Sequence, residues 1–456
     1  MVGRGTPLGC VSWPVVVAPL EPGPLFGKTG AMLSPGRPTA VGGSVAESRR
    51  QWLIVALLVV SVAINFIDRG NLSVAVPLLK VEMNLSPLQL GRLLASFFWS
   101  YAVFQLLAGW LVDRGNVNQI LAAGMMLASL ATAGSALVRG FGALLALRFL
   151  VGIGESAAYP SYSKILTQRL TESQRGVANA WIDAGSKFGP AIGTFLGGML
   201  VPRFGWRAFF IMLGLTGLIW LPFWLVLGRG NSPATVREQD LRRPTIREIL
   251  RHRAIWATFT GHFCGNYFYY FLLTWLPYYL VSERHFSMQT MGAIGAMAPL
   301  FASATTMGAA WLSRRALARG VSTTRVRKTC TVFGLGFATV IVAVPALSGA
   351  WLPIGILLFA SASYGVFSSS HWAITQTIAG PLAVGRWSGM QNFVANLAGV
   401  AAPMITGAII DRTGRFFWAF AVAGGVTLVG SAAYWFGLGR VEPAEWECAP
   451  TFPIIK

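Results

Sequence analysis

Long apolar runs separated by short polar connections fill most of this chain. A helix needs roughly 20 apolar residues to cross a bilayer, and twelve windows of the sequence reach that length. Nearly all of the connections between them are short. The pattern therefore predicts an all-α membrane protein with twelve transmembrane helices. The windows cover residues 52–79, 88–112, 119–138, 141–166, 176–200, 206–228, 254–281, 287–312, 328–348, 351–378, 386–410 and 415–438.

The longest hydrophilic segment after the N-terminal tail lies between the sixth and seventh windows. It predicts a linker at 229–253 between two six-helix halves, 51–228 and 254–440. The halves also resemble each other near their ends, in PAIGTFLGGMLVPRFGWRAFF (190–210) and PMITGAIIDRTGRFFWAF (403–420). Two such repeats favour a binding site between the halves near the middle of the membrane.

The two ends of the chain have a different composition. Residues 1–50 are rich in Gly and Pro and predict a disordered tail. A stretch within it, CVSWPVVVAPL (10–20), resembles a short signal sequence, but two prolines interrupt it and we expect no cleavage. Met32 offers an alternative start. Residues 441–456 form the predicted C-terminal tail.

Composition agrees with a membrane protein, because 54% of the residues are hydrophobic and 11% are charged, against about a quarter charged in soluble domains. The net charge of +20 does not indicate nucleic acid as a partner. Most of the 36 Lys and Arg residues fall on one side if the N-terminus is cytoplasmic. This bias predicts cytoplasmic termini and contact with the lipid bilayer. The short loops favour a bacterial inner membrane.

The residues that metals and enzymes use are sparse. The four cysteines (Cys10, Cys264, Cys330 and Cys448) have no metal-binding spacing. We expect no metal and no cofactor. With four histidines and no HExxH motif, a membrane-embedded enzyme is disfavoured. A channel is disfavoured too, because the charges deep within the windows gather in one half and do not ring a pore.

Six charged residues lie deep within the predicted spans, more than five residues from either end, and all six are in the first half. A charge at the bilayer centre costs at least a few kcal/mol, so each should face a partner or a polar cavity. The six are Asp68, Arg69, Arg148, Glu155, Asp183 and Lys187.

Spacing gives four of these charges different roles. Arg148 and Glu155 are seven residues apart, which places both on one face of a helix within RFLVGIGESAAYP (148–160). Their depth indicates a functional cavity. Asp183 and Lys187 are four apart and can pair directly. We interpret this second pair as a structural ion pair within one helix.

Asp68 and Arg69 are neighbours, so their side chains diverge by about 100° around the helix. Each should therefore meet another helix or a ligand. A buried arginine keeps its charge and binds carboxylates through two hydrogen bonds. A buried carboxylate is costly as an anion and can take up a proton. Two arginines and two carboxylates at one cavity predict a site for an organic anion that travels with protons.

The second half has no Asp, Glu, Lys or Arg deep in a span. It offers His262, His371 and Trp372, with polar or aromatic stretches such as NYFYYFLLTW (266–275). Asn392 and Asn396 lie on one helix face. Such groups suit the hydroxyls and apolar body of a ligand. The alternatives are a satisfied core histidine for His371, and packing or an interfacial belt for the aromatic residues.

Four segments together resemble a known family. They are NFIDRGNLSVA (65–75), RFLVGIGESAAYPSYSK (148–164), HFCGNYFYYFLLTWLPYYL (262–280) and GMQNFVANLAGVAAPMITGAIIDRTG (389–414). They are similar to the anion:cation symporters of the major facilitator superfamily, and the likeness covers about 52–440. That family includes bacterial transporters for galactonate, glucarate and hexuronates.

The resemblance implies roles for individual residues. Asp68 and Glu155 match the proton-coupling acids of the family, and Arg69 and Arg148 match its substrate-contacting arginines. Tyr101 matches a binding-site tyrosine of the sugar-acid members. Asn392 and Asn396 match two asparagines of the eleventh span. Phe66 departs from the pattern, because sugar-acid members often have tyrosine there.

These observations predict a monomeric, proton-coupled importer of a small organic carboxylate, such as a sugar acid. In this hypothesis Asp68 and Glu155 bind protons while Arg148, with Arg69, binds the carboxylate. The alternative keeps the fold but exchanges or exports anions, with a phosphate-bearing or aromatic acid as the substrate. Buried carboxylates beside the arginines argue against pure anion exchange, which needs no proton carriers.

Overall fold

The computed structural model describes residues 45–170, 172–228 and 244–446. Most of the predicted N-terminal tail lies outside this range, with Met32, the signal-like stretch and Cys10. So do residues 229–243 of the predicted linker, and residues 447–456 with Cys448.

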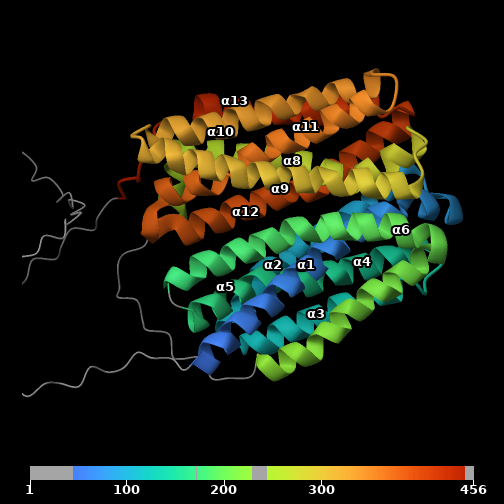
Figure 1. Cartoon of the computed structure of the whole chain (residues 1–456), viewed down its shortest axis with the longest axis horizontal. Helices are drawn as coiled ribbons and strands as arrows, with labels where there is room; N and C mark the ends of the chain where they lie inside the picture. Colours follow the sequence, from blue (N-terminus) through green and yellow to red (C-terminus); the bar gives the residue numbers. More distant parts are fainter. Residues whose placement is uncertain (1–44, 171, 229–243, 447–456) are drawn as a thin grey trace, which may run out of the picture. The chain divides into compact units, whose positions relative to one another are not determined.

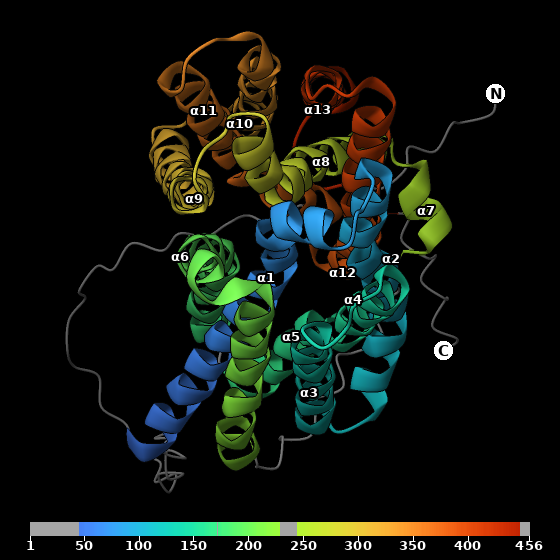
Figure 2. The same ribbon diagram turned by 90° about the vertical axis from the view of Figure 1, so that its right-hand side faces the viewer.

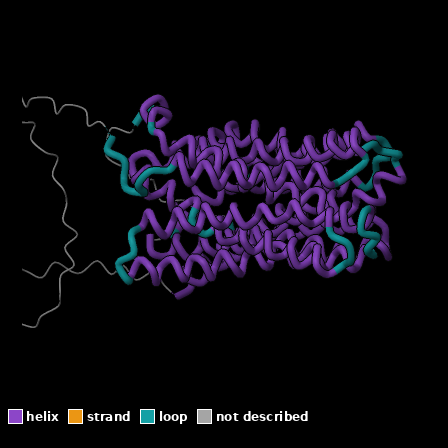
Figure 3. The backbone as a smooth tube through the Cα atoms, turned by 90° about the horizontal axis from the view of Figure 1, so that it is seen from above, coloured by secondary structure: helices purple, strands orange, loops and turns teal. Residues whose placement is uncertain are grey.

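All of the regular secondary structure in the described residues is helical (Figure 3). In the first half the helices are α1 (Val45–Glu82), α2 (Pro87–Arg114), α3 (Val117–Ser135), α4 (Phe141–Ser156), α5 (Ala158–Arg169) and α6 (Glu172–Leu227). In the second half they are α7 (Ile246–Arg251), α8 (Arg253–Ser282), α9 (Met288–Ala318), α10 (Thr323–Ala338), α11 (Trp351–Ser368), α12 (His371–Thr413) and α13 (Phe417–Ala432). A 3-10 segment, Thr339–Ala346, extends α10, and a π-helical turn, Ala433–Gly437, ends α13.

Two helices are far longer than one membrane crossing. α6 has 56 residues, roughly 84 Å if straight, against a hydrocarbon core of about 30 Å. Gly205 breaks it with a φ of 79°, and Gly380 breaks α12 with a φ of 63°. These positive angles suit glycine, which has no Cβ to clash. The predicted windows 176–200 and 206–228 lie on either side of Gly205.

Nine helices in the described part of the chain are long and apolar enough to cross a membrane. One of the nine is Val177–Leu227, which contains two predicted windows. α2 and α8, which also contain predicted spans, are 28 and 30 residues long but are not among the nine. The protein is therefore an all-helical membrane protein, and the count of twelve spans stays a prediction.

The helices pack into two bundles, one of α1–α6 and one of α8–α13 (Figure 1). In the first, α6 packs along α1 and α3, and α4 packs between α2 and α3. In the second, α12 packs along α8, and α11 packs against α9 and α10. The described residues next to the 229–243 gap, Gly228 and Pro244, mark one end of the bundles.

The bundles touch most closely at the opposite end, which we call the closed end. There α6 lies beside α9, and α2 beside α12 (Figure 2). A Cβ on Gly198 would lie 2.6 Å from the Cα of Gly292, and a Cβ on Gly407 would lie 2.6 Å from the Pro87 carbonyl oxygen. Such approach requires small residues. The two resembling segments, 190–210 and 403–420, supply these contacts from opposite sides.

Candidate functional site

A cavity of about 500 Å³ lies between the two bundles. Residues of both bundles form its wall, with the charged groups on one side and neutral polar or aromatic groups on the other. From the first bundle these are Phe66, Arg69, Tyr101, Tyr159, Asp183, Ser186 and Lys187. From the second they include His262, Asn266, Tyr269, Tyr270, Tyr364, Ser368, His371, Trp372, Ser388, Asn392 and Asn396.

Arg69 is the innermost cation of this wall, because it is more deeply buried than Lys187, the other Arg or Lys residue that lines the cavity. Its Nε donates a 2.9 Å hydrogen bond to Glu155 Oε2, and both side chains are buried, 3% and 0% exposed. The guanidinium also lies over the rings of Phe66 and Tyr101, 4.3 and 4.5 Å from their centroids. One atom on each side of the ion pair, Arg69 Nη2 and Glu155 Oε1, has no hydrogen-bond partner among the described residues. The arginine therefore retains a donor for a ligand.

Close helix packing brings this pair together. Gly152 of α4 sits against α2, where an added Cβ would lie 2.4 Å from the Phe97 carbonyl oxygen. Gly154 contacts Gly124 of α3 in the same way. These contacts fix the rotation of α4 so that Glu155 points toward α1. The sequence predicted that Arg69 meets another helix, and the structure identifies that helix as α4.

Asp68 and Arg148 form a second buried cluster behind the cavity wall. The Arg148 guanidinium donates to the backbone oxygen of Asp68, at 3.1 and 3.2 Å, and to Asn71 Oδ1 at 3.2 Å. The Asp68 carboxylate accepts from Asn71 Nδ2 at 3.1 Å. Neither Asp68 nor Arg148 lines the cavity, and Glu155 reaches it only through Arg69.

Asp183 and Lys187 form the ion pair that their spacing predicts, with 2.7 Å between Nζ and Oδ2. The interpretation as a merely structural pair did not anticipate their position, because both residues line the cavity. α6 is held against α1 through Gly185, Gly189 and Gly193, where added Cβ atoms would lie within 3.0 Å of α1 atoms. This glycine stripe aims the adjacent charged face at the cavity.

The opposite wall contains a cluster of imidazole and indole rings. His262 and His371 lie with their ring centroids 4.5 Å apart, and Trp372 packs against both. His371 Nδ1 is 3.1 Å from the Ser368 carbonyl oxygen, which can only accept, so this nitrogen carries a proton. Gln391 Nε2 lies 3.3 Å from His262 Nδ1. Both histidines therefore have a local partner, and both also line the cavity.

The span-eleven asparagines lie on this wall too. Asn396 Oδ1 accepts a 3.1 Å hydrogen bond from the Tyr270 hydroxyl, and its Nδ2 donates to the Asn392 carbonyl oxygen at 2.9 Å. The Asn392 side chain lines the cavity with both. These amides and the hydroxyl supply donors and acceptors opposite Arg69.

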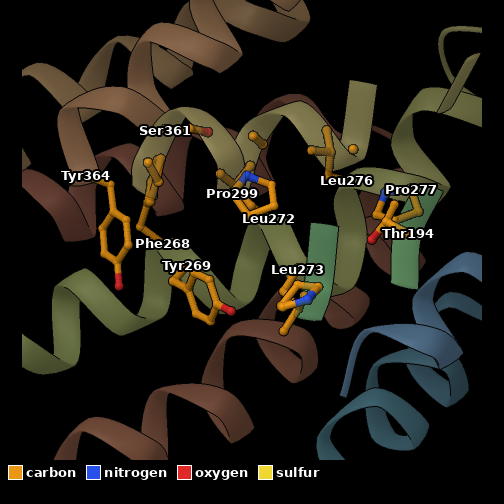
Figure 4. Close-up of a pocket in the computed structure, with 14 residues that line it drawn as sticks. Thr194, Phe268, Tyr269, Leu272, Leu273, Leu276, Pro277, Pro299, Ser361 and Tyr364 are labelled. Atoms are coloured by element: carbon orange, nitrogen blue, oxygen red, sulfur yellow. The ribbon is translucent and has the colours of Figure 1, made fainter. Parts of the chain in front are cut away.

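A small apolar recess adjoins the cavity (Figure 4). Tyr269 and Tyr364 line both spaces, while Thr194, Leu273 and Leu276 line the recess alone. Its volume of about 50 Å³ is one tenth of the 500 Å³ of the cavity. The recess is too small for a ligand body, so the larger cavity is the candidate site.

Of the nine residues predicted for the site, six line the cavity: Arg69, Tyr101, His371, Trp372, Asn392 and Asn396. Asp68, Arg148 and Glu155 lie buried behind its wall. Sequence reasoning did not single out Tyr159, Asn266, Tyr269 or Tyr364 as site residues. Asn266 and Tyr269 lie within the polar stretch 266–275, which was the signal for two of them.

Comparisons with known proteins agree with this architecture. The sequence profile of the Major Facilitator Superfamily matches residues 58–403. The chain is 29% identical over 397 residues to the "Hexuronate transporter" of Bacillus subtilis (strain 168), covering 83% of this chain and 93% of that protein. It is 28% identical over 422 residues to the "Probable L-galactonate transporter" of Escherichia coli (strain K12), covering 88% and 92%.

A solved structure shows the same fold. It is a bacterial homolog of the human lysosomal transporter Spinster, with a TM-score of 0.73, 18% identity, and coverage of 87% of this chain and 97% of that one. The predicted likeness to sugar-acid transporters is confirmed by the names of the sequence relatives. The chain is thus a multi-pass membrane protein that belongs to the Major Facilitator Superfamily, a family of transporters and not of enzymes.

Proposed function

We propose that this protein is a proton-coupled symporter that imports an organic carboxylate such as a sugar acid. The ion pair between Arg69 and Glu155 carries the proposal, because it joins the cavity's innermost cation to a buried acid. The relatives named for hexuronate and galactonate support a sugar acid as the substrate.

Competition for Arg69 gives a physical basis for the coupling. A substrate carboxylate that binds Arg69 displaces Glu155 or shares its guanidinium. An unpaired carboxylate in this buried position is strongly disfavoured, so Glu155 takes up a proton as the substrate binds. Release of the substrate restores the ion pair, and the proton leaves. Asp68, buried next to Arg148 and bonded to Asn71, is the proposed second proton site.

We further propose that the chain crosses a bacterial inner membrane twelve times as a monomer, with both termini in the cytoplasm. The breaks at Gly205 and Gly380 support separate crossings on either side of each. The basic segments next to the 229–243 gap support a cytoplasmic linker. In this orientation the closed end faces outward, and the cavity belongs to an inward-facing state.

A pH gradient tests the coupling. We expect vesicles loaded at neutral pH to accumulate labelled galactonate above its outside concentration when the outside is acidified, because protons then drive the cycle inward. A protonophore should abolish the accumulation while leaving exchange of internal for external substrate. Uptake that ignores both the pH gradient and the protonophore, and that never exceeds the outside concentration, would contradict the symporter and favour the anion exchanger or exporter.

A disulfide tests the movement of the two bundles. A Cβ on Gly295 of α9 would lie 3.9 Å from the Cβ of Thr194 of α6, within the roughly 3.5–4.5 Å range of disulfides. We expect Thr194→Cys with Gly295→Cys, with native cysteines replaced, to crosslink on oxidation. Uptake should then fall almost to zero and return on reduction, because the closed end can no longer open.

Each single cysteine variant is the control, and neither should respond to oxidation. If the crosslinked protein transports at the rate of its reduced form, this contact does not open during transport.

A further inference from the structure

Two ion pairs supply the cations of the cavity wall, and they differ greatly in exposure. Arg69 and Glu155 are 3% and 0% exposed, whereas Lys187 and Asp183 are 23% and 62% exposed. Exposed pairs contribute little net stability because water competes with each partner. An incoming carboxylate can therefore replace Asp183 at Lys187 far more easily than it can replace Glu155 at Arg69.

The two cations lie at different depths along the cavity. Gly185 of α6 contacts Val59 and Val62 of α1, and Gly189 contacts Ala63 and Phe66. Lys187 is thus level with about residue 63 of α1, six residues before Arg69, which corresponds to roughly 9 Å along the helix axis. The chain enters both helices from the linker end. Since side chains tilt toward the start of a helix, both cations shift the same way and keep their separation.

We propose that Lys187 forms a second anion subsite, and that the ligand of this cavity is a dicarboxylate with one acidic group at Arg69 and the other at Lys187. This inference rests on the proposed function, because it takes Arg69 as the first carboxylate site. The Lys187 ammonium has three donors, and among the described residues only Asp183 is bonded to it. The remaining donors are available on the cavity wall.

Charge balance supports a dianion. The six charged residues deep within the spans consist of three acids and three bases, so they sum to zero. Protons on Asp68 and Glu155 leave two positive charges, which a dicarboxylate neutralises and a monocarboxylate does not. His262 and His371 count as neutral, because burial disfavours a charged imidazolium and two of them with centroids 4.5 Å apart would also repel. A neutral centre is the state that crosses a low-dielectric region at least cost.

Two sugar acids of equal length separate the subsites. Galactarate has a carboxylate at both ends, and galactonate at one end only. We would measure their binding to the purified full chain by calorimetry, at one pH and without any gradient. Lys187→Gln should weaken galactarate binding about 10- to 100-fold, the loss of one charge-assisted contact, and should leave galactonate within about twofold. Lys187→Arg, which keeps the charge, should restore most of the galactarate affinity.

Three results would overturn the inference. One is an equal loss of both ligands in Lys187→Gln, and another is no loss of either. The third is tighter binding of an amino-bearing sugar acid that Asp183→Asn abolishes, which would make the exposed pair a site for a zwitterion. In all three, an Arg69-dependent affinity for galactonate leaves the proposed function intact. If the wild-type chain binds neither acid, the proposed function fails and the inference fails with it.

Discussion

Glu155→Gln abolishes accumulation of substrate against its gradient and leaves counterflow exchange in place. A glutamine is neutral, as the protonated acid is, and its side-chain oxygen can still accept from Arg69 Nε. The variant therefore resembles a carrier that is always loaded with its proton. Substrate still binds and crosses, but no proton moves with it, so a pH gradient no longer drives uptake.

The measurement compares pH-driven uptake with exchange at equal pH, in the same vesicles. Glu82→Gln is the matched control, because Glu82 is an acid of α1 that lies outside the cavity. Its carboxylate accepts a 2.6 Å hydrogen bond from Trp206 Nε1. It should accumulate substrate as the wild type does. If Glu155→Gln concentrates substrate normally, Glu155 is not the coupling acid.

Arg69→Ala has the second large effect, on both binding and stability. Losing this cation should weaken carboxylate binding by about 1.5–3 kcal/mol, the range for hydrogen bonds to charged groups. The same change leaves Glu155 buried without its partner, and breaking a buried pair in this way costs about 3–5 kcal/mol. Calorimetry with galactonate measures the first loss, and thermal unfolding of the purified protein measures the second.

A double variant separates these two effects. Arg69→Ala with Glu155→Gln removes both charges, so the thermal stability should recover most of its loss. Binding should not recover, because no cation remains at the inner end of the cavity. Recovery of galactonate binding in the double variant would show that Arg69 acts only by neutralising Glu155.

Apolar run length predicted an all-helical membrane protein, but it did not show how consecutive helices are joined. The windows 176–200 and 206–228 are predicted as separate spans, and within α6 a kink at Gly205 lies between them. A single residue at positive φ changes the direction of a helix without changing its hydrophobicity. In the sequence, the two closest contacts between the bundles appear only as small residues, for example in GTFLGG (193–198).

The charges of the site were predictable, but their partners were not. Spacing placed Arg148 and Glu155 on one face of a helix, yet only Glu155 reaches Arg69, while Arg148 bonds the backbone of Asp68. The rotation of α4 against α2, through Gly152, turns the face that carries both side chains toward α1, where they meet different groups. Tertiary contacts of this kind decide rotation, and no local pattern encodes them. For the same reason, the sequence alone did not place Tyr159 and Tyr364 at the cavity.

The neutral wall of the cavity has a consequence for how such a chain changes over generations. Every charge deep within the spans belongs to the first bundle, and the second bundle contributes rings, amides and hydroxyls from α8, α11 and α12. Substitutions there alter the shape and hydrogen bonding seen by the ligand while the proton-binding acids stay as they are. New specificities can therefore arise by mutation of one bundle alone, with the energy source inherited intact from the other.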